Sequence, residues 1–159
     1  MPDQTTLSLD DLLAQEDRLQ FAAFDNDTAW RLGVTLVEAA RARGVHVTVD
    51  IRRGDQQVFH AAMPGTTADN DEWVERKIRV VRRFEHSSYY MGRTYTDAGK
   101  NFADQPHIDP GLFAAHGGCF PILVRGAGIV GTVTVSGLPQ AVDHDLVVTT
   151  LETFLAAEG

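Results

Sequence analysis

The sequence contains a single cysteine, Cys119, among its 159 residues. One thiol excludes an intramolecular disulfide and a metal cage built from several thiolates. No stretch approaches the ~20 apolar residues that cross a bilayer, and residues 1–11 lack a basic segment followed by an apolar run. We therefore expect a cytoplasmic protein with no membrane partner.

Basic residues are also scarce, because 14 Lys and Arg stand against 22 Asp and Glu and give a formal net charge of −8. Broad binding to a phosphate backbone needs Lys and Arg spread over one face, so nucleic acid is not an expected partner. Hydrophobic residues make up 43% and charged residues 23%, as in ordinary globular chains. A chain of this length buries enough surface for one core but hardly two, so residues 1–159 are expected to form a single domain.

The strong catalytic signatures are missing too: the sequence has no GxSxG, Walker, HExxH or CxxC motif. The glycine-rich run Gly126-Ala127-Gly128 lies between two expected strands, where no helix follows to hold a phosphate. It therefore predicts a hairpin turn rather than a nucleotide site.

The hydrophobic pattern predicts two β-hairpins set among helices. Residues 45–52 alternate apolar and polar side chains and 56–62 return beside them; 120–124 and 129–135 form the second pair. Helical patterns cover residues 10–18, 26–43, 69–84, 89–102 and a segment from about 143 onward. This order favours an α+β fold with a single antiparallel sheet built from the two hairpins. We expect the helices to pack mainly on one side of it, in a profilin- or PAS-like arrangement.

Two helices carry informative details. Gly33 inside the helix at 26–43 costs about 1 kcal/mol relative to Ala, so it either permits close packing on the sheet or is merely tolerated. In the helix at 69–84, Asp69 followed by Glu72 resembles a capping box.

The helix at 69–84 is also strongly basic. Its positive field could hold a carboxylate or a propionate, but a solvated face that pairs with neighbouring Glu residues is the favoured interpretation. Lys77 lies nearest the apolar stripe and is expected to point inward. The five cations are Arg76, Lys77, Arg79, Arg82 and Arg83.

Candidate metal ligands are few and scattered. His116 precedes Cys119 by three residues, and Asp143 and His144 adjoin near the last helix. A zinc site needs four ligands, or three plus water, so separate elements would have to converge. Cys119 is explained more simply as a small buried apolar residue and Asp143 as a helix N-cap, which leaves His116, Asp143 and His144 as weak metal candidates.

His60 and His86 are of the type that ligates haem iron. Each also has a structural explanation: His60 lies on a strand, and His86 follows the basic helix, where its charge complements the helix dipole.

Several motifs resemble the haem-degrading-domain family. They are residues 70–77, Ser87-Ser88, residues 117–122, and the Val-Ser-Gly-Leu-Pro-Gln run at 135–140 ahead of Asp143-His144. The chain is most similar to the family's intracellular branch of proteins of about this length, relatives of the GlcG and HbpS proteins. The similarity extends from Leu9 to Leu155.

The resemblance implies one α+β domain, self-assembly into a homo-oligomer (a dimer or larger), and haem or iron binding in some members. It implies no particular reaction. No haem ligand transfers residue by residue, because the matching positions are glycines, prolines and hydrophobic turn residues. The export signals of the secreted haem-binding relatives are not found, so we do not expect an extracellular haem-sensing role.

Three functional interpretations stay open, and they leave undecided whether the protein is an enzyme. The first is a protein that binds haem or a related small anionic ligand, with Arg76 or Lys77 neutralising acidic groups and His86 or His60 near the metal. The second is a non-catalytic assembly or adaptor protein that acts through its oligomeric surface, because polar strand faces such as that of Thr132 and Thr134 need water or a neighbour. The third is a hydrolase or transferase that uses His116, Asp143 and His144, with Ser136 or Cys119 as nucleophile.

Overall fold

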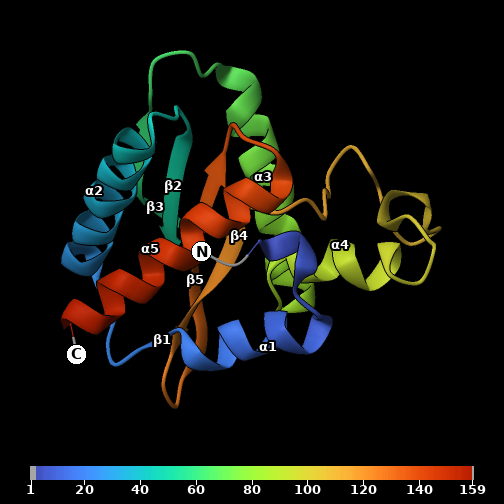
Figure 1. Ribbon diagram of the computed structural model, residues 1–159, viewed down its shortest axis with the longest axis horizontal. Helices are drawn as coiled ribbons and strands as arrows, with labels where there is room; N and C mark the ends of the chain where they lie inside the picture. The colour runs from blue at the N-terminus through green and yellow to red at the C-terminus, as the bar shows by residue number, and fades with distance from the viewer. Residues whose placement is uncertain (1–2, 159) are drawn as a thin grey trace.

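A computed structural model describes residues 3–158 (Figure 1). Its helices are α1 (Leu9–Arg18), α2 (Asn26–Arg43), α3 (Ala68–Phe84), α4 (Ser88–Thr96) and α5 (Gln140–Glu158), with 3-10 turns at Gln4–Thr6 and Phe102–Asp104. Its strands are β1 (Gln20–Phe21), β2 (Thr48–Arg53), β3 (Gln56–Ala62), β4 (Cys119–Val124) and β5 (Gly128–Ser136). No helix within residues 3–158 has the length and apolar character needed to cross a membrane.

All the strands belong to one sheet in the order β1-β4-β5-β2-β3. The two predicted hairpins are β2–β3 and β4–β5, and they join through antiparallel pairing of β5 with β2, where Ile51 lies opposite Val133. The single α+β sheet is therefore confirmed. The sheet is mixed rather than purely antiparallel, because β1 pairs in parallel with β4. A two-residue strand is too short to show an alternating pattern in the sequence.

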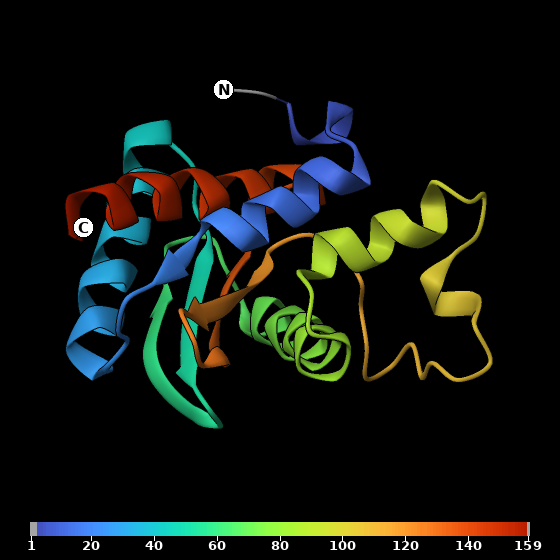
Figure 2. The ribbon, with the colours of Figure 1, turned by 90° about the horizontal axis from the view of Figure 1, so that it is seen from below.

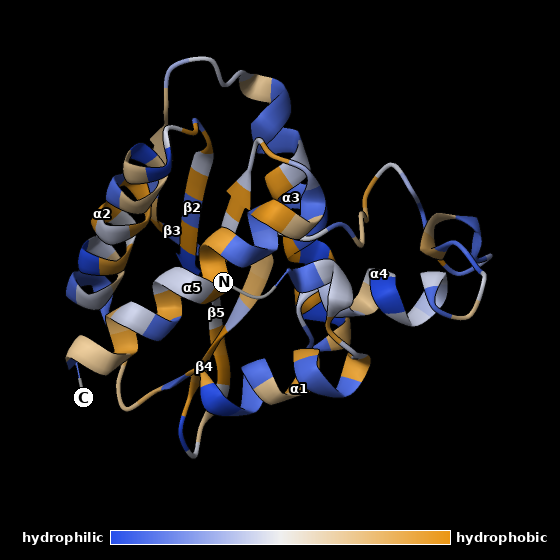
Figure 3. Ribbon diagram, viewed as in Figure 1, coloured by the Kyte–Doolittle hydropathy of each residue, from blue (hydrophilic) through white to orange (hydrophobic). Residues whose placement is uncertain are grey.

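The helices cover both faces of the sheet, so the expectation that they lie mainly on one side is wrong. Apolar side chains such as Ile51, Phe120 and Val133 pack with α2 and α5, whereas Cys119 packs with the apolar side of α3. Figure 2 shows α3 on the opposite side of the sheet from α1 and α5. In Figure 3, hydrophobic residues concentrate in the strands, while α3 carries hydrophilic residues along much of its length.

The polar strand positions are buried beneath α3. Thr48, Thr132 and Thr134 are at most 1% exposed, whereas their alternation with Val and Ile predicts a polar face that needs water or a neighbour. Threonine combines a methyl group with one hydroxyl, which makes its burial less costly than that of a larger polar residue. Because α3 of the same chain covers this face, the face no longer argues for a second subunit.

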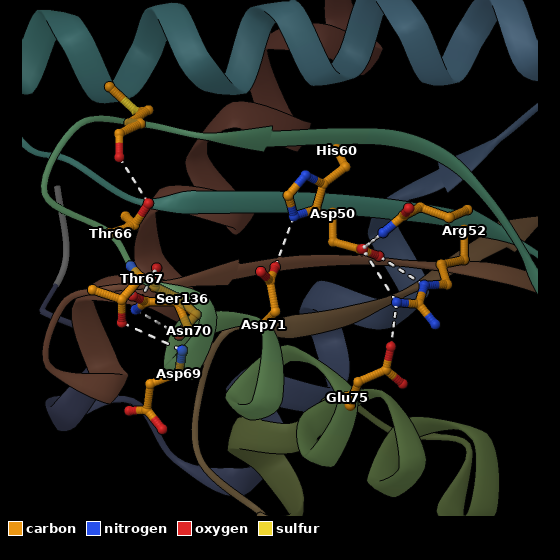
Figure 4. A network of polar contacts seen from close by, with 12 residues as sticks. Asp50, Arg52, His60, Thr66, Thr67, Asp69, Asn70, Asp71, Glu75 and Ser136 are labelled. Carbon is orange, nitrogen blue, oxygen red and sulfur yellow. Dashed lines mark hydrogen bonds and ion pairs between the residues drawn. The ribbon is translucent and has the colours of Figure 1, made fainter.

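A buried carboxylate on the same face ties the sheet to α3. Asp50 accepts hydrogen bonds from Arg52 Nε at 3.0 Å and from Gln57 Nε2 at 2.6 Å, and Arg52 also donates to Glu75 of α3 at 2.6 Å (Figure 4). Buried charges are tolerated where they are paired and hydrogen-bonded, as here.

Three helix boundaries in the structure differ from those predicted from the sequence. The helix at 69–84 begins at Ala68 because Thr67 is its N-cap and forms a capping box with Asn70, so the Asp69–Glu72 assignment is wrong. The predicted helix 89–102 ends at Thr96, just before Gly99, which has a positive φ. The last helix begins at Gln140, ahead of the predicted Asp143.

Arginines of α3 donate hydrogen bonds to the backbone of the irregular segment between α4 and β4. Arg76 donates to the carbonyl of Pro110 at 2.8 Å, Arg79 to Leu112 at 3.1 Å and Arg83 to His107 at 3.3 Å. These cations therefore bond mainly to backbone carbonyls, rather than to neighbouring Glu residues as the favoured interpretation expected.

Gly33 allows α2 to approach β3 closely. A Cβ at this position would overlap the ring of Phe59. We expect Gly33→Ala to lower the free energy of unfolding by about 1–3 kcal/mol through overpacking, although alanine favours a helix by about 1 kcal/mol.

Chemical denaturation of a double-mutant cycle with Phe59→Leu tests this. In the Phe59→Leu background the alanine should be neutral or stabilising. A Gly33→Ala variant more stable than the starting protein would show that the close approach is unimportant.

Candidate functional site

Two adjoining cavities lie where α3, the segment before β4 and the start of α5 meet. The first is about 240 Å³ and the second about 210 Å³, and His116 and Gln140 line both. We call them the outer and inner lobes of the His116 groove. The outer lobe is also lined by Asn70, Trp73, Lys77, Ser136 and Asp143.

A buried ion pair forms the floor of the outer lobe. Lys77 Nζ donates to the carbonyl of Val135 at 3.1 Å and to Asp143 Oδ2 at 3.2 Å, and these two charged residues are 3% and 2% exposed. The backbone N–H of Leu138 donates to Asp143 Oδ1 at 3.0 Å, and that of Gly137 donates to Oδ2 at 3.4 Å. Lys77 thus points inward as predicted. Asp143 binds the turn ahead of α5 rather than serving as its N-cap.

Burial perturbs both members of the pair. It lowers the pKa of Lys77, an effect that Asp143 opposes, and it raises the pKa of Asp143 from 3.8 to about 6, which Lys77 and the two backbone N–H groups oppose. Both directions indicate that desolvation outweighs the attraction within the pair. A costly charged pair beside a cavity is a physical reason to consider a functional site.

Aromatic stacking organises the wall of the groove. The guanidinium carbon of Arg76 lies 4.5 Å from the centroid of the Trp73 ring, and the His116 ring lies 5.1 Å from it. Burial, with smaller contributions from Lys77 and then Arg76, lowers the pKa of His116. His116 is therefore neutral near pH 7 and offers one donor and one acceptor nitrogen.

The structure does not bring His60 and His86 to this groove. His60 Nε2 lies 2.7 Å from Asp71 near the start of α3 (Figure 4), whereas His86 Nδ1 lies 3.0 Å from Glu16 beyond the end of α3. At about 1.5 Å rise per residue, the length of helix between these places is about 20 Å, too far for both to serve one metal ion.

His144 lies in the core, apart from His116. Its Nε2 is 2.8 Å from Gln15 Oε1, its ring is 4.8 Å from that of Tyr89, and burial lowers its pKa to about 3. An amide oxygen only accepts, so Nε2 carries the proton of a neutral ring.

The metal and nucleophile interpretations gain no geometric support. Within residues 3–158, no three His, Cys, Asp or Glu side chains are grouped to hold a metal ion, so His116, Asp143 and His144 do not form such a set. Burial raises the pKa of Cys119 to about 12, which leaves an unreactive thiol. Across the same residues, no hydrogen bond joins Ser136 to His116 or Asp143.

The sequence pointed to Arg76, Lys77, His116 and Asp143 as separate candidates, and the fold brings them together. It gave no functional role to Asn70, Trp73 and Gln140. An aromatic residue in an amphipathic helix is ordinarily part of its packing, and only the path of residues 97–118 brings His116 against Trp73.

Two cavities bear on haem binding. One of about 740 Å³ lies beside β1, the start of α2 and the end of α5, and no His, Cys, Met or Tyr is among the described residues that line it. The His116 groove has a histidine, but each lobe is smaller than the about 300–1,000 Å³ typical of sites that enclose a drug-sized ligand.

Removing Lys77 should leave a buried charge without a partner. We expect Lys77→Met to lower the free energy of unfolding at pH 8 by about 3–5 kcal/mol. Because the pKa of Asp143 is raised, its protonated form favours folding, and that contribution is lost as the pH rises through about 6. The loss in free energy of unfolding caused by Lys77→Met should therefore be smaller at pH 5 than at pH 8.

Urea denaturation at the two pH values measures this, with Lys77→Met/Asp143→Asn as the control that removes both charges. The double variant should lose less stability at pH 8 than the single one. Equal losses at pH 5 and pH 8 for the single variant would contradict the argument.

Comparisons with known proteins agree with this architecture. A UPF0303 protein of Streptomyces avermitilis is 55% identical over 148 residues, covering 93% of this chain and 91% of that protein. The crystal structure of Ybr137w protein superimposes with a TM-score of 0.88 at 29% identity, covering 96% of this chain and 90% of that one. The structure of a PduOC:Heme complex has a TM-score of 0.68 at 19% identity, with 82% and 94% coverage, a likeness of fold alone. Residues 24–152 match the family described as "Haem degrading protein HbpS-like", and the chain belongs to that family.

Proposed function

We propose that the protein binds a small carboxylate-bearing ligand in the His116 groove. The observation that carries this proposal is the guanidinium of Arg76. It lines the inner lobe and has no carboxylate partner among residues 3–158. An unpaired cation in a cavity of a protein with net charge −8 attracts anions locally against the overall field.

The hydrogen-bonding groups of the groove suit a carboxylate. Arg76 uses one nitrogen on the carbonyl of Pro110, and its Nε is buried without a hydrogen-bond partner. Within residues 3–158 the guanidinium forms no other hydrogen bond, so its remaining Nη donors are available to a ligand oxygen in the inner lobe. The ammonium of Lys77 has three donors, two of which are engaged by Val135 and Asp143, which leaves one N–H for the outer lobe.

Repulsion from acidic side chains is small. Of the described residues that line the two lobes, Asp143 alone is acidic. Its oxygens are already engaged by Lys77 and by the backbone N–H groups of Gly137 and Leu138. An incoming carboxylate therefore meets a carboxylate whose charge is largely compensated.

Haem is the second ligand to test, because the family is described as haem-degrading and one structural neighbour is a haem complex. The proposed binding mode does not include it, because the cavity beside β1 offers no iron ligand among the described residues and the lobes of the His116 groove are small. Self-assembly into a homo-oligomer and cytoplasmic localisation stay predictions. The polar strand face no longer supports the adaptor interpretation, because that face is buried beneath α3.

Arg76→Met should weaken binding of a small carboxylate by about tenfold or more, because a hydrogen bond to a charged group contributes about 1.5–3 kcal/mol. Isothermal titration with a panel of monocarboxylates from acetate to phenylacetate measures this. The matched control is Arg79→Met, since Arg79 also bonds to a backbone carbonyl of the same segment but lines neither lobe. No saturable binding by any member of the panel, or equal losses in the two variants, would refute the proposal.

Replacing His60 and His86 together should leave the visible spectrum of protein with added haem unchanged. Each imidazole is engaged by a carboxylate, and neither lines the groove. Spectra of the starting protein, His60→Ala/His86→Ala and His116→Ala are compared. A Soret shift that the double replacement abolishes and His116→Ala preserves would place the ligand away from the groove.

A further inference from the structure

The inner lobe has the size and walls of a compartment for one ring. Its volume is about 210 Å³. An apolar protein cavity of about 150 Å³ holds a benzene molecule. Three aromatic side chains line the inner lobe, those of Tyr89, Phe102 and Phe113, together with the small residues Ala115 and Ala141. A planar ring can pack there edge-to-face or offset against the aromatic walls.

The two lobes differ in chemistry, and their junction carries the donors. His116 and Gln140 line both lobes, and Lys77 lines the outer one. Arg76 and Arg93 line the inner one, but Arg93 is engaged by Asp97 and by the carbonyls of Gln4 and Leu7. A ligand whose ring occupies the inner lobe would therefore hold a carboxylate on a short linker at this junction. The Nη donors of Arg76 that no described residue engages then gain an acceptor, while His116, neutral near pH 7, adds no charge of its own.

We infer that the ligand of the groove is a carboxylate bearing a single six-membered planar ring, with the ring in the inner lobe and the carboxylate between Arg76 and Lys77. This inference rests on the proposed function, because it names the class of carboxylate that the same groove selects. By the comparison with benzene, one ring fits the inner lobe, whereas a two-carbon acid leaves the lobe without a ligand group to pack on its aromatic walls.

The test compares ligands that share a carboxylate and differ in the body attached to it. Isothermal titration with phenylacetate, acetate and 2-naphthylacetate should show phenylacetate bound at least tenfold more tightly than acetate. Acetate measures the contribution of the carboxylate alone. 2-Naphthylacetate measures the size limit of the inner lobe.

A variant that fills the inner lobe tests the location of the ring. Ala141, half-buried in the first turn of α5, lines the inner lobe and not the outer one. Ala141→Leu should weaken phenylacetate binding at least tenfold and change acetate binding less than twofold, whereas Ala141→Ser should leave both nearly unchanged. If Ala141→Leu does not fold, Ala103→Leu fills the lobe from its exposed wall with the same expectations.

The possible results of these titrations distinguish the inference about the ring from the proposed carboxylate site. Phenylacetate selectivity that Ala141→Leu removes supports the inference. Acetate binding as tightly as phenylacetate, or Ala141→Leu weakening both equally, overturns the inference while the carboxylate site stands. Absence of binding by every carboxylate overturns the proposed function itself.

Discussion

The ion pair between Lys77 and Asp143 joins the two sides of the sheet. Lys77 comes from α3, which packs on one face, and Asp143 comes from α5, which packs on the other. The carbonyl of Val135 in β5 accepts from the same ammonium. Because both charges are buried, neither residue can be lost alone without leaving an unpaired charge, which constrains how the helices close over the end of the sheet.

The residues that carry the family resemblance surround this pair. Gly118 has a φ of +135°, and a Cβ there would lie 2.7 Å from Lys77 Nζ. The turn formed by Gly137 and Leu138 directs two backbone N–H groups at Asp143. These glycine and turn positions therefore shape the floor of the cavity as well as the turns of the fold. The fold and the site depend on the same residues.

The sequence predicted the structure best where the residues of a single helix or hairpin determine the feature. Alternation predicted the hairpins, and the apolar stripe of α3 predicted that Lys77 points inward. The sequence was less informative where a second layer of structure matters. Thr132 and Thr134 pointed to a face that needs water or another subunit, yet α3 of the same chain covers them. The meeting of His116 with Trp73 depends on residues 97–118, an irregular path with little periodic signal. His60 was a candidate by residue type alone, and its neighbour Asp71 became visible only in the folded chain.

The arginines of α3 that contact the irregular segment have two different roles. Arg79 and Arg83 donate to carbonyls of the irregular segment and lie outside both lobes, so their charges mainly hold that segment in place. Arg76 donates to the same segment and also lines the inner lobe. The shape of the groove and the position of the segment are therefore coupled through one guanidinium. A ligand that accepts from its remaining N–H groups acts on a side chain already fixed by Pro110 and Trp73, and such preorganisation lowers the entropic cost of binding.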